Sequence, residues 1–128
     1  MEINDKIFHN PTAGLLPFFG VIEAVVDYMS EMPRAHYRIV IGTDSQQYNG
    51  HVDFVGVIAL HRVGHGGRYF WTKNVQKRRL VLRQRMYEEA GLSLKMAQEV
   101  VTALKAALKH EPLLQYDLEI HVDVGPNG

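Results

Sequence analysis

The sequence predicts an α/β domain built around one mixed sheet, and the order of its apolar segments carries this prediction. A helical stripe is followed by three segments with strand character, a long helical segment and a final strand. A helix between two strands forms a crossover, so the last strand should lie parallel to a neighbour, most simply the first strand. We therefore expect an antiparallel three-strand meander plus a parallel fourth strand, with flanking helices.

The first helix is expected to begin near Pro17, because proline is tolerated in a first turn, and to end before Pro33. Its buried stripe recurs at helical spacing and consists of Phe18, Ile22, Val25 and Met29. Residues 1–16 are expected to be irregular, since they include the turn sequence Asn10-Pro11-Thr12-Ala13-Gly14.

Three strands are expected over residues 37–44, about 52–62 and 69–72. The first alternates and is rich in β-branched residues, whereas the second is almost continuously apolar, which indicates burial on both faces. Asn49-Gly50 is a strong hairpin signal, and Gly64-His65-Gly66-Gly67 forms the next turn.

A helix is expected from about residue 80 to residue 109, and Pro112 follows its end. Gly91 is expected to kink or split this helix, and Ser93 is a candidate cap for the second half. Residues 118–124 alternate between apolar and polar side chains and form the expected fourth strand.

Composition sets limits on the class of protein. The length of 128 residues suits one compact domain, and the formal net charge of +0 gives no global attraction to nucleic acid. The absence of cysteine excludes disulfides and thiolate metal sites. The first residues lack the pattern of a signal peptide, and no apolar stretch approaches the ~20 residues that span a membrane. We expect a cytoplasmic protein without a membrane partner.

Acidic residues at the ends of two strands are the main candidates for chemistry. Asp44 and Asp123 should meet at one edge of the sheet, and Glu88 or Glu89 of the long helix should face them. Carboxylate oxygens suit Mg²⁺ or Mn²⁺, and two such ions ~4 Å apart stabilise both oxygens of a phosphodiester displacement. The alternative is structural: the two aspartates belong to turns and the glutamates are solvated.

A basic run precedes the glutamates. It contains no acidic residue and includes Lys77, Arg78, Arg79, Arg83 and Arg85. These side chains would flank the acidic site and could contact a phosphate backbone. The alternative is an ordinary solvated helix start.

Taken together, several motifs resemble the YkuK-type family of predicted ribonuclease H-like nucleases. They are Phe8-His9-Asn10-Pro11-Thr12, Ile41-Gly42-Thr43-Asp44-Ser45-Gln46, Gly64-His65-Gly66-Gly67, Leu82-Arg83-Gln84-Arg85 with Glu89 and Ser93-Leu94, and Glu119-Ile120-His121-Val122-Asp123-Val124-Gly125. The resemblance implies a single ribonuclease H-like domain over residues 1–128 with strand order 3-2-1-4. It assigns Asp44, Glu89 and Asp123 as metal-binding catalytic residues, with Glu88 as the alternative to Glu89.

The family continues past the Asp-Val-Gly turn, so the resemblance also implies that the C-terminal part is truncated. A homodimer is one way to cover the side of the fourth strand that this leaves open. The expected function is Mg²⁺- or Mn²⁺-dependent hydrolysis of RNA, DNA or a hybrid. The alternatives are a non-catalytic module that binds nucleic acid or protein, and nucleotide binding in the manner of the actin and sugar-kinase superfamily.

Overall fold

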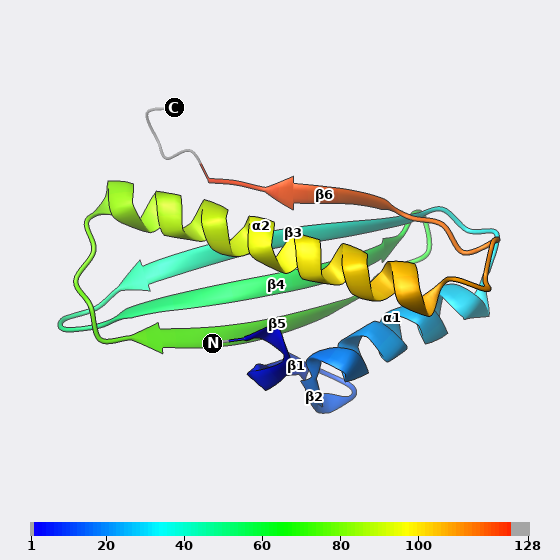
Figure 1. Ribbon diagram of the computed structural model, residues 1–128, viewed down its shortest axis with the longest axis horizontal. Helices are drawn as coiled ribbons and strands as arrows, with labels where there is room; N and C mark the ends of the chain where they lie inside the picture. Colours follow the sequence, from blue (N-terminus) through cyan, green and yellow to red (C-terminus); the bar gives the residue numbers. More distant parts are fainter. Residues whose placement is uncertain (1, 124–128) are drawn as a thin grey trace.

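The computed structural model describes residues 2–123, which form one sheet with helices packed against it (Figure 1). The helical elements are η1 (Ile3–Asp5), α1 (Phe18–Glu31) and α2 (Leu82–Ala107). The strands are β1 (Ile7–Asn10), β2 (Gly14–Pro17), β3 (Tyr37–Gln47), β4 (Val52–Arg62), β5 (Gly67–Gln76) and β6 (Asp117–His121). Val124 and the glycine-bearing turn after it lie outside the described residues.

The strand order is β2-β1-β5-β4-β3-β6. Strands β3, β4 and β5 form the expected antiparallel meander, and β6 pairs in parallel with β3. The mixed α/β sheet is therefore confirmed, and the expected order 3-2-1-4 corresponds to β5-β4-β3-β6. The crossover through α2 brings the carboxyl ends of β3 and β6 to the same edge of the sheet.

The hairpin formed by β1 and β2 corrects the expectation that residues 1–16 are irregular. It extends the sheet beyond β5, where His9 pairs with Trp71. The Asn10 Oδ1 accepts hydrogen bonds from the backbone N–H groups of Thr12 and Ala13, at 2.9 and 2.7 Å. The turn itself was expected, but strands of 4 residues are too short to show a clear alternation.

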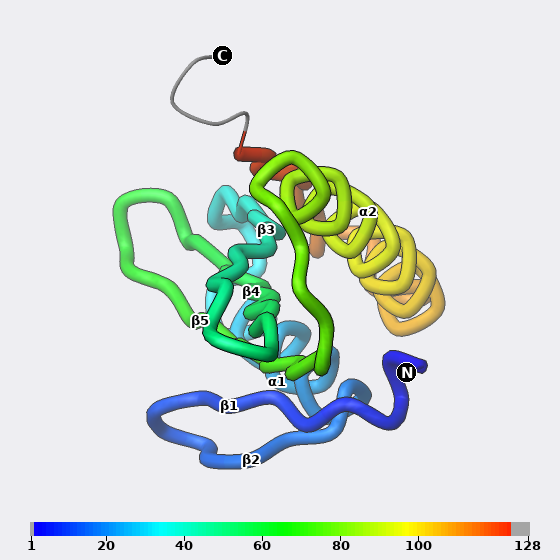
Figure 2. The backbone as a smooth tube through the Cα atoms, turned by 90° about the vertical axis from the view of Figure 1, so that its left-hand side faces the viewer, coloured from blue at the N-terminus to red at the C-terminus, as the bar shows by residue number. Residues whose placement is uncertain are grey.

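Both helices lie on the same face of the sheet, as Figures 1 and 2 show. The main core lies between the helices and this face, because alternate residues of the central strands point toward it. Its largest fully buried side chains include Tyr37, Phe8, Phe70, Met29, Ile39 and Ile41. The other face, here called the open face, carries no helix of the described chain, and its central residues are only partly buried.

The long helix α2 is continuous through Gly91, so the expected split there is wrong. Nothing lies within 4 Å of a Cβ built on this exposed glycine, and one glycine costs a helix only about 1 kcal/mol. Ser93 caps no second helix: its hydroxyl donates to the Thr43 Oγ1 at 2.9 Å and ties α2 to β3. Gly56 allows this close approach, since a Cβ there would overlap the Met96 Cε.

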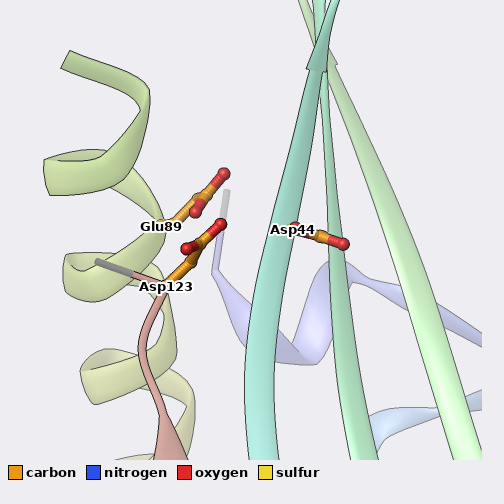
Figure 3. A group of neighbouring side chains, drawn as sticks. All are labelled: Asp44, Glu89 and Asp123. Atoms are coloured by element: carbon orange, nitrogen blue, oxygen red, sulfur yellow. The ribbon is translucent and has the colours of Figure 1, made fainter. Parts of the chain in front are cut away.

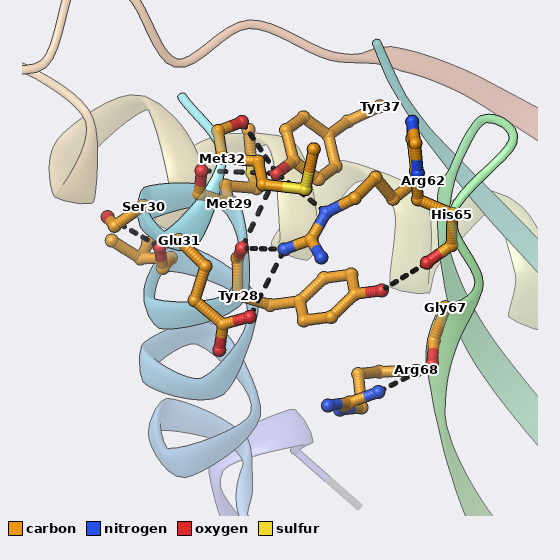
Figure 4. Close-up of polar contacts among 11 residues, drawn as sticks. Tyr28, Met29, Ser30, Glu31, Met32, Tyr37, Arg62, His65, Gly67 and Arg68 are labelled. Carbon is orange, nitrogen blue, oxygen red and sulfur yellow. Dashed lines mark hydrogen bonds and ion pairs between the residues drawn. The ribbon is translucent and has the colours of Figure 1, made fainter. Parts of the chain in front are cut away.

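A buried arginine lies where β3 begins and β4 ends (Figure 4). The Arg62 Nε donates to the Tyr37 Oη at 3.1 Å, and its Nη2 donates to the Tyr28 carbonyl at 2.5 Å and to Glu31 at 3.3 Å. The guanidinium also stacks 3.8 Å from the centroid of the Tyr28 ring. This group, here called the Arg62 cluster, joins α1 to the sheet.

Neither α1 nor α2, the helices of the described chain, combines the length and the apolar character needed to cross a lipid bilayer.

Candidate metal centre

Three carboxylates gather at the edge of the sheet where β3 and β6 run out (Figure 3). One carboxylate oxygen from each of Asp44, Glu89 and Asp123 lies within 4.8 Å of the others. Asp44 belongs to β3, Glu89 to α2, and Asp123 to the segment that follows β6. These are the three residues singled out in the sequence, and they come from three separate elements.

The strand register explains how the two aspartates meet. Gly42 pairs with His121, so Asp44 and Asp123 each lie two residues further along parallel neighbours. Side chains two residues apart in a strand share a face, which puts Asp44 on the open face with Gly42. Both aspartates are exposed, whereas only 6% of the Glu89 surface is accessible.

Glu89 reaches the cluster from the helix side and is held there by β3. The Ser45 hydroxyl donates a short hydrogen bond to the Glu89 Oε2. Arg85, one helical turn before Glu89, donates from Nη1 to the Ser45 carbonyl at 3.2 Å. The Glu89 Oε1 is buried and has no hydrogen-bond partner among the described residues. A buried charged oxygen without a partner is costly, so this atom is suited to an external ligand.

Glu88, the alternative acidic residue, faces elsewhere. Its Oε1 lies 3.6 Å from the Arg78 Nη1, and it does not belong to the carboxylate cluster. Successive helical residues differ in direction by about 100°, so only one of two adjacent glutamates can face the strand ends.

The basic residues lie beside the cluster rather than in it. Lys77, Arg78 and Arg79 occupy the connection between β5 and α2, and Arg83 and Arg85 lie in the first turn of α2. Lys77, Arg78, Arg79 and Arg83 are exposed, whereas Arg85 is partly buried against Ser45. The run therefore divides into an exposed group and one residue, Arg85, that supports the site.

Gln47 fixes the connection that carries these basic residues. Its Nε2 donates to the His51 carbonyl at 2.8 Å and to the Arg78 carbonyl at 3.3 Å. Its Oε1 accepts from the Leu80 backbone N–H at 2.9 Å, just before α2 begins. One side chain thus joins the hairpin after β3 to the start of α2. This contact helps to fix the position of α2 along β3, and with it the position of Glu89.

The sequence did not predict the supporting role of four residues at this site: Thr43, Ser45, Gln47 and Ser93. A partial signal was present, because Thr43, Ser45 and Gln47 alternate with Asp44 and must point to the face opposite to it. Three polar residues on the inward face of a buried strand predict contact with a polar stretch of the covering helix. His121, near Asp123 in sequence, contacts Glu119 at 3.3 Å.

The donor set fits a hard divalent cation. All three candidate ligands offer carboxylate oxygens, which suit Mg²⁺ or Mn²⁺ better than softer metals. Three carboxylates this close repel one another when ionised, and a cation would remove that repulsion. The buried Glu89 Oε1 gives a second, independent reason to place a ligand here.

Comparison with known proteins gives two matches. The model of the family described as Ribonuclease H-like matches residues 20–128. The "Uncharacterized protein YkuK" of Bacillus subtilis (strain 168) is 28% identical over 131 residues, covering 95% of this chain and 75% of that protein. No solved structure matches significantly. The matched region includes α2 and β3 to β6, and therefore all three carboxylates.

Proposed function

Since this chain belongs to the Ribonuclease H-like family, we propose that it is a nuclease that hydrolyses phosphodiester bonds with the help of divalent metal. The observation that carries the proposal is the meeting of Asp44, Glu89 and Asp123, with carboxylate oxygens within 4.8 Å of one another. The buried, unpartnered Glu89 Oε1 supports it, because structural carboxylates normally have their hydrogen bonds satisfied.

In this proposal the three carboxylates hold Mg²⁺ or Mn²⁺. A bound ion of this kind would supply charge neutralisation for the phosphate and activation of water. Ser45 keeps the Glu89 carboxylate turned toward the strand ends, and Arg85 holds Ser45 through its carbonyl. Lys77, Arg78, Arg79 and Arg83 contact the phosphates on either side of the bond that is cut. The substrate is RNA, DNA or a hybrid.

The test combines cleavage with thermal melting of wild type and Asp44→Asn. We expect wild type to cleave labelled nucleic acid in Mg²⁺ but not in EDTA, and Asp44→Asn to lose at least 100-fold in rate. Mn²⁺ should raise the melting midpoint of wild type, because a ligand that binds only the folded state stabilises it. The same ion should do far less for the mutant.

Glu88→Gln is the matched control, because Glu88 neighbours Glu89 in sequence but contacts Arg78. It should keep both the cleavage and the response to Mn²⁺. Equal Mn²⁺ responses in wild type and Asp44→Asn would contradict the proposed metal site. A response to Mn²⁺ without cleavage of any nucleic acid would contradict the nuclease while keeping the metal, and would favour a non-catalytic binding module.

A further inference from the structure

A wide groove opens on the sheet face that carries Asp44. Its volume is about 890 Å³, within the range of ligand pockets. Its floor is apolar and formed by side chains of the two central strands, namely Val40, Val55, Val57 and Ala59. Asp44 and Asp123 border the same groove, so the candidate metal centre and this apolar floor form one continuous surface.

A missing side chain deepens the groove next to the carboxylates. Gly42 lies two residues before Asp44 on the same face, between Val57 of β4 and His121 of β6. A Cβ built on Gly42 would meet only His121 atoms, at 3.7 and 3.8 Å, which is ordinary contact distance. Close packing therefore does not require a glycine at position 42. The absence of a side chain there leaves open space beside the candidate metal centre.

An aromatic wall stands on the side of the groove away from the carboxylates. The Trp71 ring stacks on the His9 ring, with centroids 4.0 Å apart and planes inclined by 12°. His9 lies on β1 and covers one face of the indole, so the opposite face is directed toward β4 and the groove that Trp71 lines. The stack with His9 holds the indole in an orientation that can receive a flat ring.

The separation between Trp71 and the carboxylate cluster matches the size of one nucleotide. Trp71 pairs with Val57, which pairs with Gly42, so two strand spacings, or roughly 10 Å, separate the wall from the β3 row that includes Asp44. One nucleotide can bridge such a gap, with its phosphate near the carboxylates and its base near the indole. Lys73 and Asp53, paired at 3.2 Å, add a donor and an acceptor at the groove's end.

We propose that this groove is a nucleobase-binding subsite for single-stranded nucleic acid, in which the indole of Trp71 stacks on a base whose phosphate lies at the carboxylate cluster. The proposal rests on the proposed function and deepens it by naming the substrate class. A duplex keeps its bases stacked on one another, so only an unpaired base can present its flat face to Trp71. The net charge of +0 agrees with a contact that relies on stacking as well as on phosphate.

The single tryptophan of the chain makes the subsite directly observable. We would titrate wild type with a short oligothymidylate in Ca²⁺, which replaces Mg²⁺ to limit cleavage, and record tryptophan emission. Stacking should quench the emission in a saturable way, and a hairpin duplex of the same length should not. The Asp44→Asn variant should need more oligonucleotide for the same quenching.

Variants locate the contact. Trp71→Leu should weaken binding of the labelled oligothymidylate, measured by anisotropy, by about tenfold, the size of one base–aromatic stack. Gly42→Val should weaken it similarly by filling the floor, while the melting response to Mn²⁺ stays. Tyr69→Leu is the matched control: Tyr69 is 49% exposed on the same strand and face but outside the groove, and its loss should leave affinity unchanged.

The two proposals fail in different ways. Saturable quenching without any Mg²⁺-dependent cleavage would keep the subsite and overturn the nuclease. Cleavage and a normal Mn²⁺ response, with Trp71→Leu and Gly42→Val binding as tightly as wild type, would overturn the subsite alone. A change in emission that follows protein concentration instead of oligonucleotide would also overturn it, because a second copy of the chain would then cover the groove.

Discussion

The Arg62 cluster at the amino end of β3 and the carboxylates at its carboxyl end treat buried charge in opposite ways. The guanidinium of Arg62 donates to a phenol, a carbonyl and a carboxylate and stacks on a ring. Glu89 is about as buried, yet its Oε1 has no partner in the described chain and two more carboxylates lie nearby. The satisfied charge of Arg62 joins elements of the fold, whereas the unpartnered oxygen of Glu89, with two more carboxylates beside it, is the atom that we propose contacts a metal ion.

The largest change in the free energy of unfolding should come from removing a hydrogen-bond partner of the buried Arg62. Tyr37→Phe removes the hydroxyl that accepts from the Arg62 Nε and lies 2.9 Å from the Met32 carbonyl, leaving both without this partner. We expect a loss of about 2 kcal/mol in the free energy of unfolding, measured by urea denaturation. Tyr69→Phe, at an exposed tyrosine, should change it little. An unchanged midpoint for Tyr37→Phe would mean that water replaces the hydroxyl at no cost.

The carboxylate end should behave in the opposite way. Glu89→Gln keeps the size of the side chain but removes one of the mutually repelling charges, so metal-free stability should stay or rise, by up to about 1 kcal/mol. The increase in melting midpoint caused by Mn²⁺ should be lost together with cleavage. A metal-free variant less stable than wild type by about 1 kcal/mol or more would class Glu89 with the structural charges.

Exposed charges near the same end provide a smaller test. Replacing Arg79 and Arg83 together with alanine should weaken nucleic-acid binding for all sequences. The slope of log affinity against log salt should fall by about 2, which is about 1 for each arginine that no longer neutralises a phosphate. Lys105→Ala, at the other end of α2, is the matched control and should leave the slope unchanged. An unchanged slope in the double variant would place these arginines outside the interface.

The sequence predicted the arrangement of the strands well, because the alternation of apolar and polar side chains extends over many residues. The alternation in β3 and β6 and the crossover through α2 were enough to bring Asp44 and Asp123 to one edge. The choice between Glu88 and Glu89 needed the phase of α2 relative to β3, which the hydrogen bonds of Ser45 and Ser93 define. Such interactions join residues more than 40 positions apart, and periodicity carries no information about them.

Two expectations failed because local signals were weighed without their surroundings. The turn at Asn10 was recognised, but the short strands on either side were not; they pair with each other and join the sheet where His9 of β1 pairs with Trp71 of β5. A split of α2 at Gly91 was one expectation, yet the helix is continuous there, because the packing of neighbouring turns on the sheet outweighs a cost of about 1 kcal/mol. In both cases tertiary packing decided the outcome.

Lys6 is an intermediate case between the satisfied charge of Arg62 and the unsatisfied charge of Glu89. Its ammonium group is partly buried but does not lie at the candidate metal centre. It lines a small pocket beneath α2 with Thr43 and Met96, and burial, together with the charge of Lys95, lowers the pKa of its ammonium group. The unfolded chain therefore binds a proton more tightly at Lys6 than the folded chain does. As pH rises through the lowered pKa toward the ordinary value of 10.5, the folded state loses its proton first and the energetic penalty of the buried charge disappears.

Lys6→Met should thus raise the free energy of unfolding at pH 7. The expected gain is only a few tenths of a kcal/mol, because solvent screens a group that is only partly buried. It should also remove part of the gain in stability that wild type shows in mildly alkaline solution. Urea denaturation at pH 7 and pH 10 on both proteins measures this, with Lys109→Met as an exposed control. Equal pH dependence in wild type and Lys6→Met would show that the ammonium group reaches solvent.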